Sequence, residues 1–571
     1  MPTAAASWAG WPSRAWMALL GALLALHLGL GIHFACRASV THDEYWHLPA
    51  GLAVLKSGRF DADNLNPPLS RIWSALPLAL AGVPLGDPSP ANDSTALGDH
   101  FLQANPSRYH LVYALGRCMN LVWSVLAGIL IALWGRRLFG PTAGLLGAAL
   151  WLCCPIVLSN AALVTPDLCT AFFFLATTYA AWQFAAEPSG RRALAVGVVL
   201  GLAQLAKFTC VVLLPAVFVI WGTVRWGTAL PRLGWRRWFT YWGSVLAVSL
   251  LVLNAGYLFR GTCEPWNSYQ FASTTLQAVT QHFSPADWVR IPAPRDYVAG
   301  FDRQRSIMQA LHPVYLDGEL LSGIGFRDYY FWACVYKWSH ATQVLVVLAM
   351  FSLVFSRSGW RQWRVHAAVL FPAILTITIA SVSHMQLGIR YILPAFPLIY
   401  LFTGHLGNWI HSPRRLWRKI ALALCLPGLF WGLRYHPHHL AYFNELSGGP
   451  LAGPTHLLDS NIDWGQDLRE LKHYLDSERV DSIGLAYFGM VPPARLGFHY
   501  QFPPSFKEMR AQGGLPPGWY AVSVNFVYSR PHTMRDAHDE IRAVGPVEFS
   551  YFQSLQPVAR IGWSIYVYRV E

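Results

Sequence analysis

The sequence predicts a mainly α-helical, polytopic membrane protein with about eleven transmembrane helices and a small C-terminal α/β domain. Of the 571 residues, 54% are hydrophobic and only 13% are charged, whereas charged residues make up about 25% of a typical soluble protein. Apolar runs long enough to cross a bilayer as helices recur between short basic loops. Residues 435–571 lack these runs and contain short strand-like segments instead. These features exclude a soluble globular protein.

The apolar runs give the positions of the expected spans. The first run, Ala15 to Ala35, follows Arg14 and is expected to be a retained helix, because it lacks the short core and cleavage site of a signal peptide. The two short runs on either side of Lys207 are expected to form a helical hairpin with a tight outer turn. The expected spans are 14–36, 110–134, 142–160, 166–186, 193–206, 208–224, 239–259, 328–355, 364–382, 389–409 and 418–434.

Basic residues give the expected orientation, because they fall in alternate loops and positively charged loops are usually cytoplasmic. The N-terminus is therefore expected inside and residues 435–571 outside, in a multi-pass plasma (inner) membrane protein. This clustering also accounts for the formal net charge of +13, so no nucleic-acid partner is expected. The basic loop residues are Arg136, Arg137, Arg191, Arg192, Arg225, Arg232, Arg236, Arg237, Arg357, Arg361, Arg364, Arg414, Arg415, Arg418 and Lys419.

Two external loops are long enough to contain structure of their own. The first, 37–109, is expected to include helices lying on the membrane surface, and the second, 260–327, is proline-rich and of a size that is usually functional or disordered. We divide the chain into a transmembrane domain, 1–434, and a soluble extracytoplasmic domain, 435–571. In the latter, DWGQDLRELKHYLDS predicts a helix, and SIGLAYFG, GWYAVSVNFVY and WSIYVYRV predict strands.

The first external loop begins with adjacent carboxylates, Asp43 and Glu44, where the chain leaves the membrane. A charge buried in hydrocarbon is expensive, so acids placed at this boundary point to function. The alternative is that Thr41 or Asp43 merely caps a helix by accepting from free backbone N–H groups.

Further polar residues fall at the outer ends of expected spans, as a site shared between helix ends would require. The positions of Lys207 and Lys337 have an alternative explanation, because long basic side chains near helix ends often reach the membrane–water interface. Arg390 starts a span on the exterior side, against the positive-inside bias, and therefore favours function. The candidate substrate-binding residues are His47, Asn66, Arg71, Asp167, Lys207, Lys337, His384, Arg390 and Tyr391.

Several motifs, in the same order along the chain, resemble the C-type glycosyltransferase fold. They are the Asp-Glu pair after the first helix, NPPL in the same loop and TPD before the fourth span. GLAQLAKFTCVVLLP, YYFWACVYKW, GIRYILPAFPL, YFNELSGGP and DSNIDWGQDL extend the similarity over nearly the whole chain. More narrowly, the chain resembles glycosyltransferase family 39, the polyprenyl-phosphate-sugar-dependent group that includes protein O-mannosyltransferases and aminoarabinose transferases.

The resemblance implies roles for individual residues. Asp43 corresponds to the catalytic carboxylate, a general base on the acceptor, with Glu44 supporting it. Asp167, in the TPD motif before the fourth expected span, matches the acid that the family carries in its own second external loop. Arg390 matches a basic residue near the lipid-linked phosphate, and Lys207 is a weaker candidate for that role. Some relatives carry a phosphate-binding lysine where this chain has Asn66, which shifts that role toward Arg390, Lys207, Arg71 and Lys337.

The chemistry is consistent with such a site. A sugar on a polyprenyl phosphate already has a good leaving group, so the protein must supply a base for the acceptor hydroxyl and cations for the departing phosphate. Attack opposite the phosphate would invert the anomeric centre. A monophosphate donor relaxes the need for a divalent metal, so we expect no cofactor and no obligatory metal.

Two other polar stretches have structural explanations. In DSNIDWGQDLRE, Asp459, Asn461, Asp463 and Glu470 follow a calcium-loop spacing, but the glycine comes one position late. A turn with an acidic helix N-terminus is therefore favoured. His436, His438 and His439 lie just beyond the last span and are interpreted as interfacial residues rather than metal ligands.

The sequence thus predicts an enzyme that moves one sugar from a polyprenyl-phosphate donor to a hydroxyl of an envelope protein, lipid or glycan at the exterior face. Membrane lipids are the other expected partners, and the acceptor is unknown. Two alternatives stay open. One is a polytopic transporter. The span pattern shows no internal repeat, which argues against it. The other is a non-catalytic polyprenyl-lipid-binding protein of envelope assembly.

Overall fold

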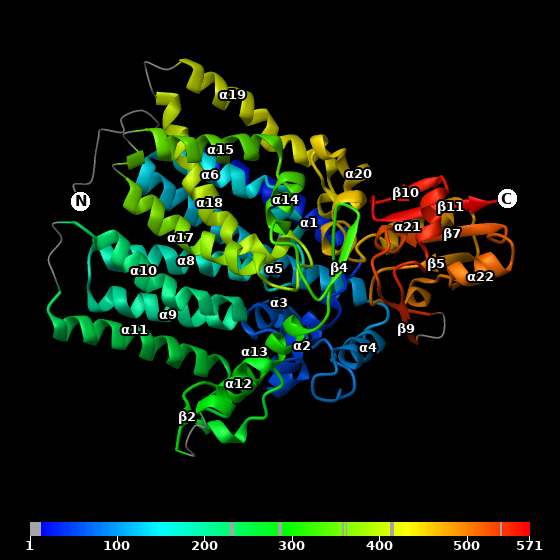
Figure 1. Ribbon diagram of the computed structural model, residues 1–571, viewed down its shortest axis with the longest axis horizontal. Coiled ribbons are helices and arrows are strands. Elements are labelled where there is room, and N and C mark those ends of the chain that lie inside the picture. The colour runs from blue at the N-terminus through cyan, green and yellow to red at the C-terminus, as the bar shows by residue number, and fades with distance from the viewer. Residues whose placement is uncertain are drawn as a thin grey trace.

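The computed structural model describes residues 13–228, 233–283, 288–356, 359–360, 362–411, 416–536 and 540–571. A body of long, roughly parallel helices carries short helices and a C-terminal sheet at one end (Figure 1). The predicted fold class, mainly helical with a small C-terminal α/β region, is therefore confirmed. Of the basic loop residues used for orientation, Arg232, Arg357, Arg361, Arg414 and Arg415 lie outside the described residues.

Within the described ranges, six helical segments are long and apolar enough to cross a membrane. A further pair, α6 (Pro141–Leu152) and α7 (Pro155–Ala161), would make a seventh span, although the two helices are bent by 62° at Cys153 and Cys154. The six are α1 (Ser13–Arg37), α5 (Tyr109–Phe139), α8 (Asp167–Ala186), Phe208–Arg225, α11 (Trp235–Gly256) and α17 (Trp363–Ser381).

The remaining expected spans are shorter or broken. Where a helical hairpin was expected, Lys207 separates α9 (Gly190–Ala206) from a 3-10 turn (Phe208–Val212) and α10 (Leu213–Arg225), and both helices pack against α8. Span 328–355 is split where Ser339 caps the second of its two helices. Span 389–409 contains prolines, which disrupt regular helical hydrogen bonding. These pieces are α14 (Tyr329–Lys337), α15 (His340–Phe355), η4 (Ile389–Ala395), α18 (Phe396–Thr403), η5 (Gly404–His411) and α19 (Leu416–Trp431). The count of about eleven spans stays a prediction.

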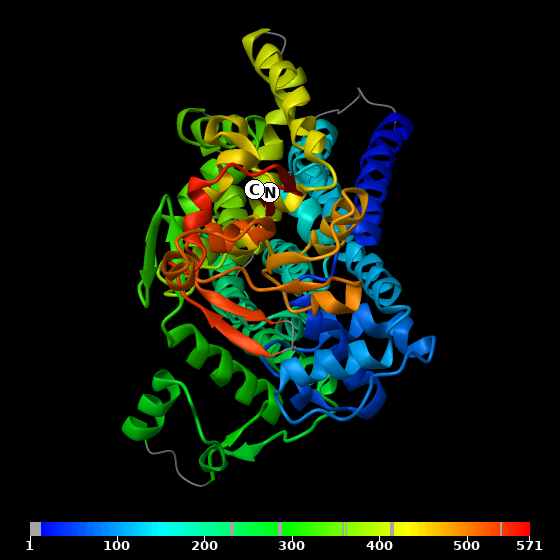
Figure 2. The same ribbon diagram turned by 90° about the vertical axis from the view of Figure 1, so that its right-hand side faces the viewer.

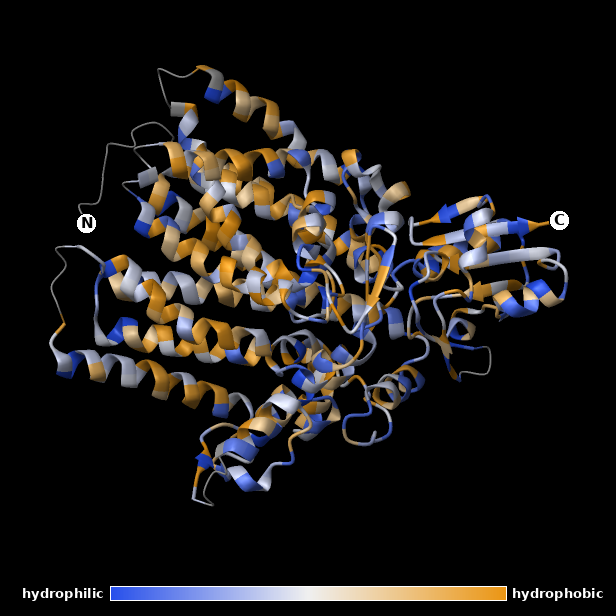
Figure 3. Ribbon diagram, viewed as in Figure 1, coloured by the Kyte–Doolittle hydropathy of each residue, from blue (hydrophilic) through white to orange (hydrophobic). Residues whose placement is uncertain are grey.

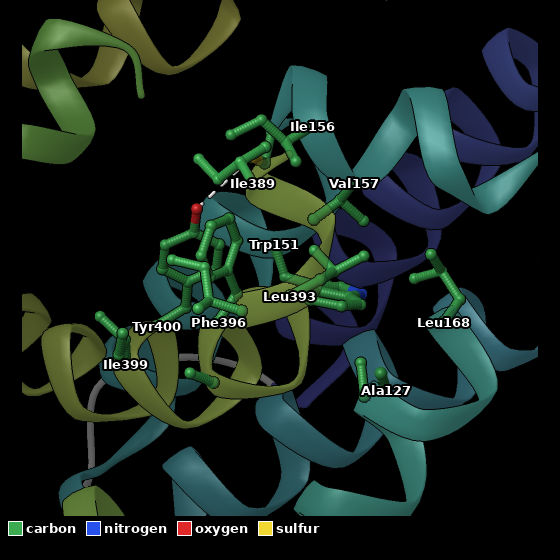
Figure 4. Close-up of a cluster of buried hydrophobic side chains, with 14 of the residues drawn as sticks. Ala127, Trp151, Ile156, Val157, Leu168, Ile389, Leu393, Phe396, Ile399 and Tyr400 are labelled. Atoms are coloured by element: carbon green, nitrogen blue, oxygen red, sulfur yellow. Dashed lines mark hydrogen bonds between the residues drawn. The ribbon is translucent and has the colours of Figure 1, made fainter. Parts of the chain in front are cut away.

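Close helix packing holds the body together. At Gly144 of α6, an added Cβ would lie 2.2 Å from the carbonyl oxygen of Ala132 on α5, so only glycine allows this approach. Trp151, Phe396 and Tyr400 pack in the buried core between α6 and α18 (Figure 4). Such a dense core gives the helix ends fixed positions, which a site built from several helices requires.

The two ends of the body differ in chemistry. Hydrophobic residues run along α8, α10 and α11, whereas polar residues are common among the short helices and in the sheet (Figure 3). At the opposite end, basic residues contact neighbouring helix ends: Arg225 donates to the carbonyl of Ala185, and Arg364 donates to that of Gly227. The basic residues at the end of α10 and the start of α17 therefore lie together with the end of α8.

The long loops supply the short helices and hairpins at the sheet-bearing end. Loop 37–109 contains helices, and their place on the membrane surface stays a prediction; the described part of loop 260–327 contains two α-helices and two small strand pairs. The elements are α2 (Glu44–Ser57), η1 (Phe60–Ala62), α3 (Leu69–Leu80), α4 (Ser94–Ala104), β1 (Glu264–Pro265), α12 (Thr274–Phe283), β2 (Arg290–Ile291), α13 (Arg295–Gln309), β3 (Pro313–Leu316) and β4 (Glu319–Ser322).

The C-terminal region forms a five-stranded mixed sheet in the order β10-β11-β7-β5-β6. Strand β5 pairs in parallel with β6 and β7, and β11 pairs antiparallel with β7 and β10. Figure 2 shows this sheet in front of the helical body, beside the helices of the first loop. Its elements are α20 (Gly449–His456), α21 (Leu468–Ser477), β5 (Ile483–Ala486), β6 (Tyr500–Gln501), α22 (Phe506–Ala511), β7 (Gly518–Ser523), α23 (Val524–Val527), β10 (Ala559–Ile561) and β11 (Ile565–Val570).

Three of these strands and α21 fall in the segments where strands and a helix were expected, although α21 begins only at Leu468. A separate hairpin, β8 (His532–Arg535) with β9 (Ile541–Val544), reaches the first loop, where Arg535 donates to Asp99 at 2.7 Å. The sheet region is therefore docked on the loop that carries Asp43.

Candidate active site

Asp43 lies between α1 and α2 at the sheet-bearing end of the body. It occupies the N-cap position of α2, but its side chain accepts no capping hydrogen bond, so the helix-cap alternative is wrong for this residue. Its Oδ2 accepts from Nη1 of Arg390 at 2.9 Å, and its Oδ1 lies 3.3 Å from Nδ1 of His42. Burial alone would raise the pKa of Asp43, but Arg390 and His42 hold it well below its usual range. The carboxylate is ionised and, at 21% exposure, still accessible.

Arg390 is held in place by the C-terminal region. It is the second residue of η4, which follows Gly388; the φ of 146° at Gly388 favours glycine, and an added Cβ there would lie 2.6 Å from Ser460 Oγ. Ser460 Oγ accepts from Nε of Arg390 at 3.2 Å, and the Trp464 ring lies 4.0 Å from the guanidinium carbon. The guanidinium is therefore fixed by a hydrogen bond and a cation–π contact, and it faces Asp43.

A second ion pair lies against the first. Asp167 is the first residue of α8, where the helix dipole favours a carboxylate, and its Oδ1 accepts from Nζ of Lys207 at 2.7 Å. Lys207 is placed here because the chain is extended between α9 and the following 3-10 turn. Asp167 Oδ2 lies 3.7 Å from Arg390 and has no hydrogen-bond partner among the described residues.

These residues form one group, which we call the Asp43 cluster: Asp43, Asp167, Lys207, Arg390 and Tyr391. The ring of Tyr391 lies 5.2 Å from the Lys207 ammonium and 5.3 Å from the Arg390 guanidinium. Two carboxylates and two cations thus meet beside an aromatic ring at the ends of α8, α9 and η4. The arrangement can bind an anion through its cations and accept a proton at Asp43.

His47, Arg71 and Asn66 form a neighbouring group within the first loop. Arg71 donates from Nε to Nδ1 of His47 at 3.0 Å and from Nη2 to Asp63 at 2.6 Å. Burial first, and then Arg71, lower the pKa of His47 to about 3, so its ring is neutral. Asn66 and Arg71 line a small pocket with Arg59. Arg71 is therefore bound within the first loop, whereas Arg390 pairs with Asp43 and Lys207 pairs with Asp167.

Glu44 points away from the Asp43 cluster and is fully buried. Its two oxygens accept from Nε and Nη2 of Arg117 at 2.8 and 2.6 Å. They also accept from the backbone N–H of Val164 and from Thr41 Oγ1. Glu44 thus ties the start of α2 to α5 and to the segment before α8, which supports the position of Asp43 rather than the chemistry.

Two other predicted residues lie outside the cluster. The Lys337 ammonium donates to the carbonyls of Leu440 and Asn461 at 2.8 and 2.6 Å and lies 4.4 Å from the Phe443 ring. It therefore joins α14 to the C-terminal region. His384 is exposed in the loop after α17. Neither side chain contacts the cluster.

Sequence reasoning missed three residues that touch the cluster: His42, Ser460 and Trp464. Only their positions in the sequence could have identified them, since His42 precedes Asp43 and the other two lie in DSNIDWGQDL. In that stretch the acids have separate partners, as Asp459 accepts from Arg530 at 2.8 Å and Asp463 accepts from Ser523. The calcium-loop interpretation is therefore not supported.

A group of possible metal ligands lies apart from the cluster. Ligand atoms of His438, Asp467 and Glu470 fall within 4.8 Å of one another. Arg37 lies 4.0 Å from Glu470, and Asp467 accepts from Ser564 at 2.6 Å. Because these carboxylates already have cationic or hydrogen-bonding partners, we interpret the group as a polar contact between α1, the segment after α19 and α21.

The chain has distant likenesses among solved structures, and no curated protein sequence matches it. The ArnT protein of Cupriavidus metallidurans, bound to undecaprenyl phosphate, is 13% identical over 97% of this chain and 98% of that one, with a TM-score of 0.47. The protein O-mannosyltransferase Pmt1-Pmt2 complex of S. cerevisiae, bound to its sugar donor, is 13% identical over 74% of this chain and 89% of that one, also with a TM-score of 0.47.

A family model gives the more specific match. It covers residues 114–255, from α5 to α11, and includes Asp167 and Lys207 of the Asp43 cluster. The family is described as dolichyl-phosphate-mannose-protein mannosyltransferase. Over these residues the predicted resemblance of this chain to the protein O-mannosyltransferase group is confirmed.

Proposed function

We propose that this protein is a membrane glycosyltransferase that moves a sugar from a polyprenyl-phosphate donor to a hydroxyl group of an envelope acceptor. The observation that carries the proposal is the position of Arg390, whose guanidinium lies 2.9 Å from Asp43 and 3.7 Å from Asp167, beside the Lys207–Asp167 pair. One ionised base and two cations meet where apolar helices end. The family match over 114–255 is consistent with this chemistry.

The cations would bind the donor phosphate. In the structure, Arg390 and Lys207 are neutralised by Asp43 and Asp167. A lipid-linked phosphate at the helix ends would take over part of both pairings through charge-assisted hydrogen bonds, which are strong where water is scarce. The same cations would stabilise negative charge on the phosphate as the glycosidic bond breaks.

Phosphate binding would also activate the base. While Arg390 pairs with Asp43, the pKa of that carboxyl stays low and the carboxylate is a weak base. As the phosphate attracts Arg390, the pKa of Asp43 rises toward its usual value. Asp43 then takes the proton of the acceptor hydroxyl, the acceptor oxygen bonds to the anomeric carbon, and the bonding pair leaves with the phosphate. The anomeric centre is inverted, and no divalent metal is required.

We further propose that the cluster faces the exterior of a plasma (inner) membrane. The basic loops lie at the end of the helical body opposite the cluster, as Arg225 and Arg364 illustrate. The positive-inside bias then assigns that end to the cytoplasm. The first loop, the second loop and the C-terminal region would share the exterior side with the envelope acceptor.

Mass spectrometry of envelope glycans, lipids and proteins tests this function. A strain that lacks the chain should lose the mass of one sugar from a defined acceptor, and wild-type protein should restore it. Asp61→Asn is a matched control for substitution of Asp43. Asp61 lies in the same loop as Asp43, is 44% exposed and forms an ion pair only with Arg59 among the described residues. Identical envelope profiles with and without the chain would contradict the proposal.

A further inference from the structure

A pair of histidines extends from Asp43 into the C-terminal region. His42 Nδ1 lies 3.3 Å from Oδ1 of Asp43, and its other ring nitrogen, Nε2, lies 3.1 Å from Nε2 of His532. The three side chains thus form a line of hydrogen-bonding groups. His532 is the first residue of β8, and 490 positions separate it from His42.

The hydrogen-bonding capacity of these groups sets the direction of the line. An ionised carboxylate only accepts, so His42 Nδ1 must be the donor to Asp43. When His42 is neutral, its other nitrogen is an acceptor, and Nε2 of His42 then accepts from Nε2 of His532. His532 therefore fixes the tautomer in which His42 donates to Asp43. With Arg390 on Oδ2, each oxygen of Asp43 has one donor.

The surroundings keep His532 neutral and in place. Its ring centroid lies 4.5 Å from that of Phe488 and 4.9 Å from that of His42. Burial first, and then His42 and Arg530, hold the pKa of His532 well below its usual value. On the same strand, Arg535 donates to Asp99 of the first loop at 2.7 and 3.0 Å. The hairpin is thus anchored beside the histidine contact.

We propose that His532 is a positioning residue of the active site, so that the C-terminal region completes the site by orienting His42 and, through it, Asp43. The inference rests on the proposed function, in which Asp43 is the base. His42 and Arg390 hold the two oxygens of Asp43 so that its remaining lone pairs face the acceptor. Without His532, His42 can adopt the tautomer that presents an unprotonated nitrogen to the carboxylate.

Four variants test this chain of contacts. His532→Gln keeps an N–H donor for His42, whereas His532→Phe keeps the aromatic packing and removes the donor. His42→Asn keeps a short amide donor for Asp43 and ends the contact with His532. The double variant combines His42→Asn with His532→Phe. His473→Phe is a matched control, because His473 is exposed on α21 of the same region.

Each purified variant in lipid nanodiscs is assayed with a radiolabelled polyprenyl-phosphate sugar and an envelope extract as the acceptor source. Binding of undecaprenyl phosphate alone is measured in parallel. We expect His532→Phe to lower the transfer rate roughly 10–100-fold, by analogy with the loss seen when a group that orients a metal ligand is removed. His532→Gln should restore most of the rate. Neither variant should change undecaprenyl phosphate affinity more than about two-fold, and His473→Phe should match wild type.

The double variant separates orientation from folding. In the His42→Asn background, His532→Phe should cause no further loss of rate, because the contact is already absent. An equal loss in both backgrounds, or an equal loss for His532→Gln and His532→Phe, would overturn the proposal. Wild-type rates for His532→Phe alongside an inactive Asp43→Asn would overturn only this inference. Equal rates for Asp43→Asn and wild type would contradict the proposed function itself.

Discussion

Nη1 of Arg390 lies 2.9 Å from Oδ2 of Asp43, although 347 positions separate the two residues in the sequence. The contact joins the loop after the first helix to the start of η4. It places the proposed base next to the proposed phosphate ligand, so that one event, donor binding, changes the charge around both. The predictions below follow from this pair and from the contacts that hold it.

Arg390→Ala should weaken donor binding more than acceptor binding. A hydrogen bond to a charged group contributes about 1.5–3 kcal/mol, so the affinity for undecaprenyl phosphate should fall roughly 10–100-fold. Titration of the protein in nanodiscs measures this. Arg295→Ala is a suitable control, because Arg295 is 56% exposed and pairs with Glu264 in the second loop. Equal losses for donor and acceptor would argue against the phosphate role.

Arg117→Met should destabilise the protein strongly. Glu44 and Arg117 are both fully buried, and the substitution leaves the Glu44 carboxylate without its cation. Removal of one partner from a buried pair costs about 3–5 kcal/mol. Thermal unfolding in detergent checks this, with Glu187→Gln as the control, because Glu187 is 71% exposed in its pair with Arg192 and should have no measurable effect. An unchanged Tm for Arg117→Met would show that the pair does not hold the loop.

His438 should make stability depend on pH. Burial lowers its pKa, but Asp467 and Glu470 outweigh burial and raise the pKa above its ordinary 6.5. The folded state thus favours the protonated ring. The stabilisation is complete below about pH 6.5 and is lost as the pH rises through the raised value.

The Tm of wild type should therefore exceed that of His438→Gln by more at about pH 5.5 than at about pH 8.5. Differential scanning fluorimetry in detergent gives both values. His473→Gln is the control, because His473 is exposed on the same helix as Glu470. A larger difference at the alkaline pH would show that the sign of the interaction is wrong.

Much of the cluster could be predicted because depth in a membrane constrains the position of a residue. Asp167 and Lys207 stood out as polar residues at the outer ends of apolar runs. Arg390 stood out because it starts a span on the exterior side, against the positive-inside bias. Helix ends at one depth lie within reach of one another. The structure brings these three side chains together with Asp43 and Tyr391.

Depth alone does not determine which way a side chain points. Lys337 meets the same sequence criterion as Lys207, yet its ammonium is bound by two carbonyls of the C-terminal region. Glu44 follows Asp43 directly, but successive residues at a helix start point in different directions. One carboxylate therefore faces the cluster and the other faces Arg117.

The contribution of the C-terminal region could not be predicted from the sequence. Ser460 and Trp464 reach Arg390, and His532 reaches His42, across long sequence separations. No periodicity or spacing encodes such contacts, because they depend on how the sheet region docks on the first loop. The domain division at residue 434 therefore separated residues that contact one another in the structure.

The transfer rate of Asp43→Asn tests the central claim most directly. Asparagine has almost the same shape as aspartate but cannot act as the base, and general-base catalysis contributes about 10²–10⁴-fold. In nanodiscs, with a radiolabelled polyprenyl-phosphate sugar and an envelope extract, the rate should fall by that factor. Undecaprenyl phosphate binding should persist, and Asp61→Asn should match wild type. An Asp43→Asn rate equal to that of wild type would contradict the account.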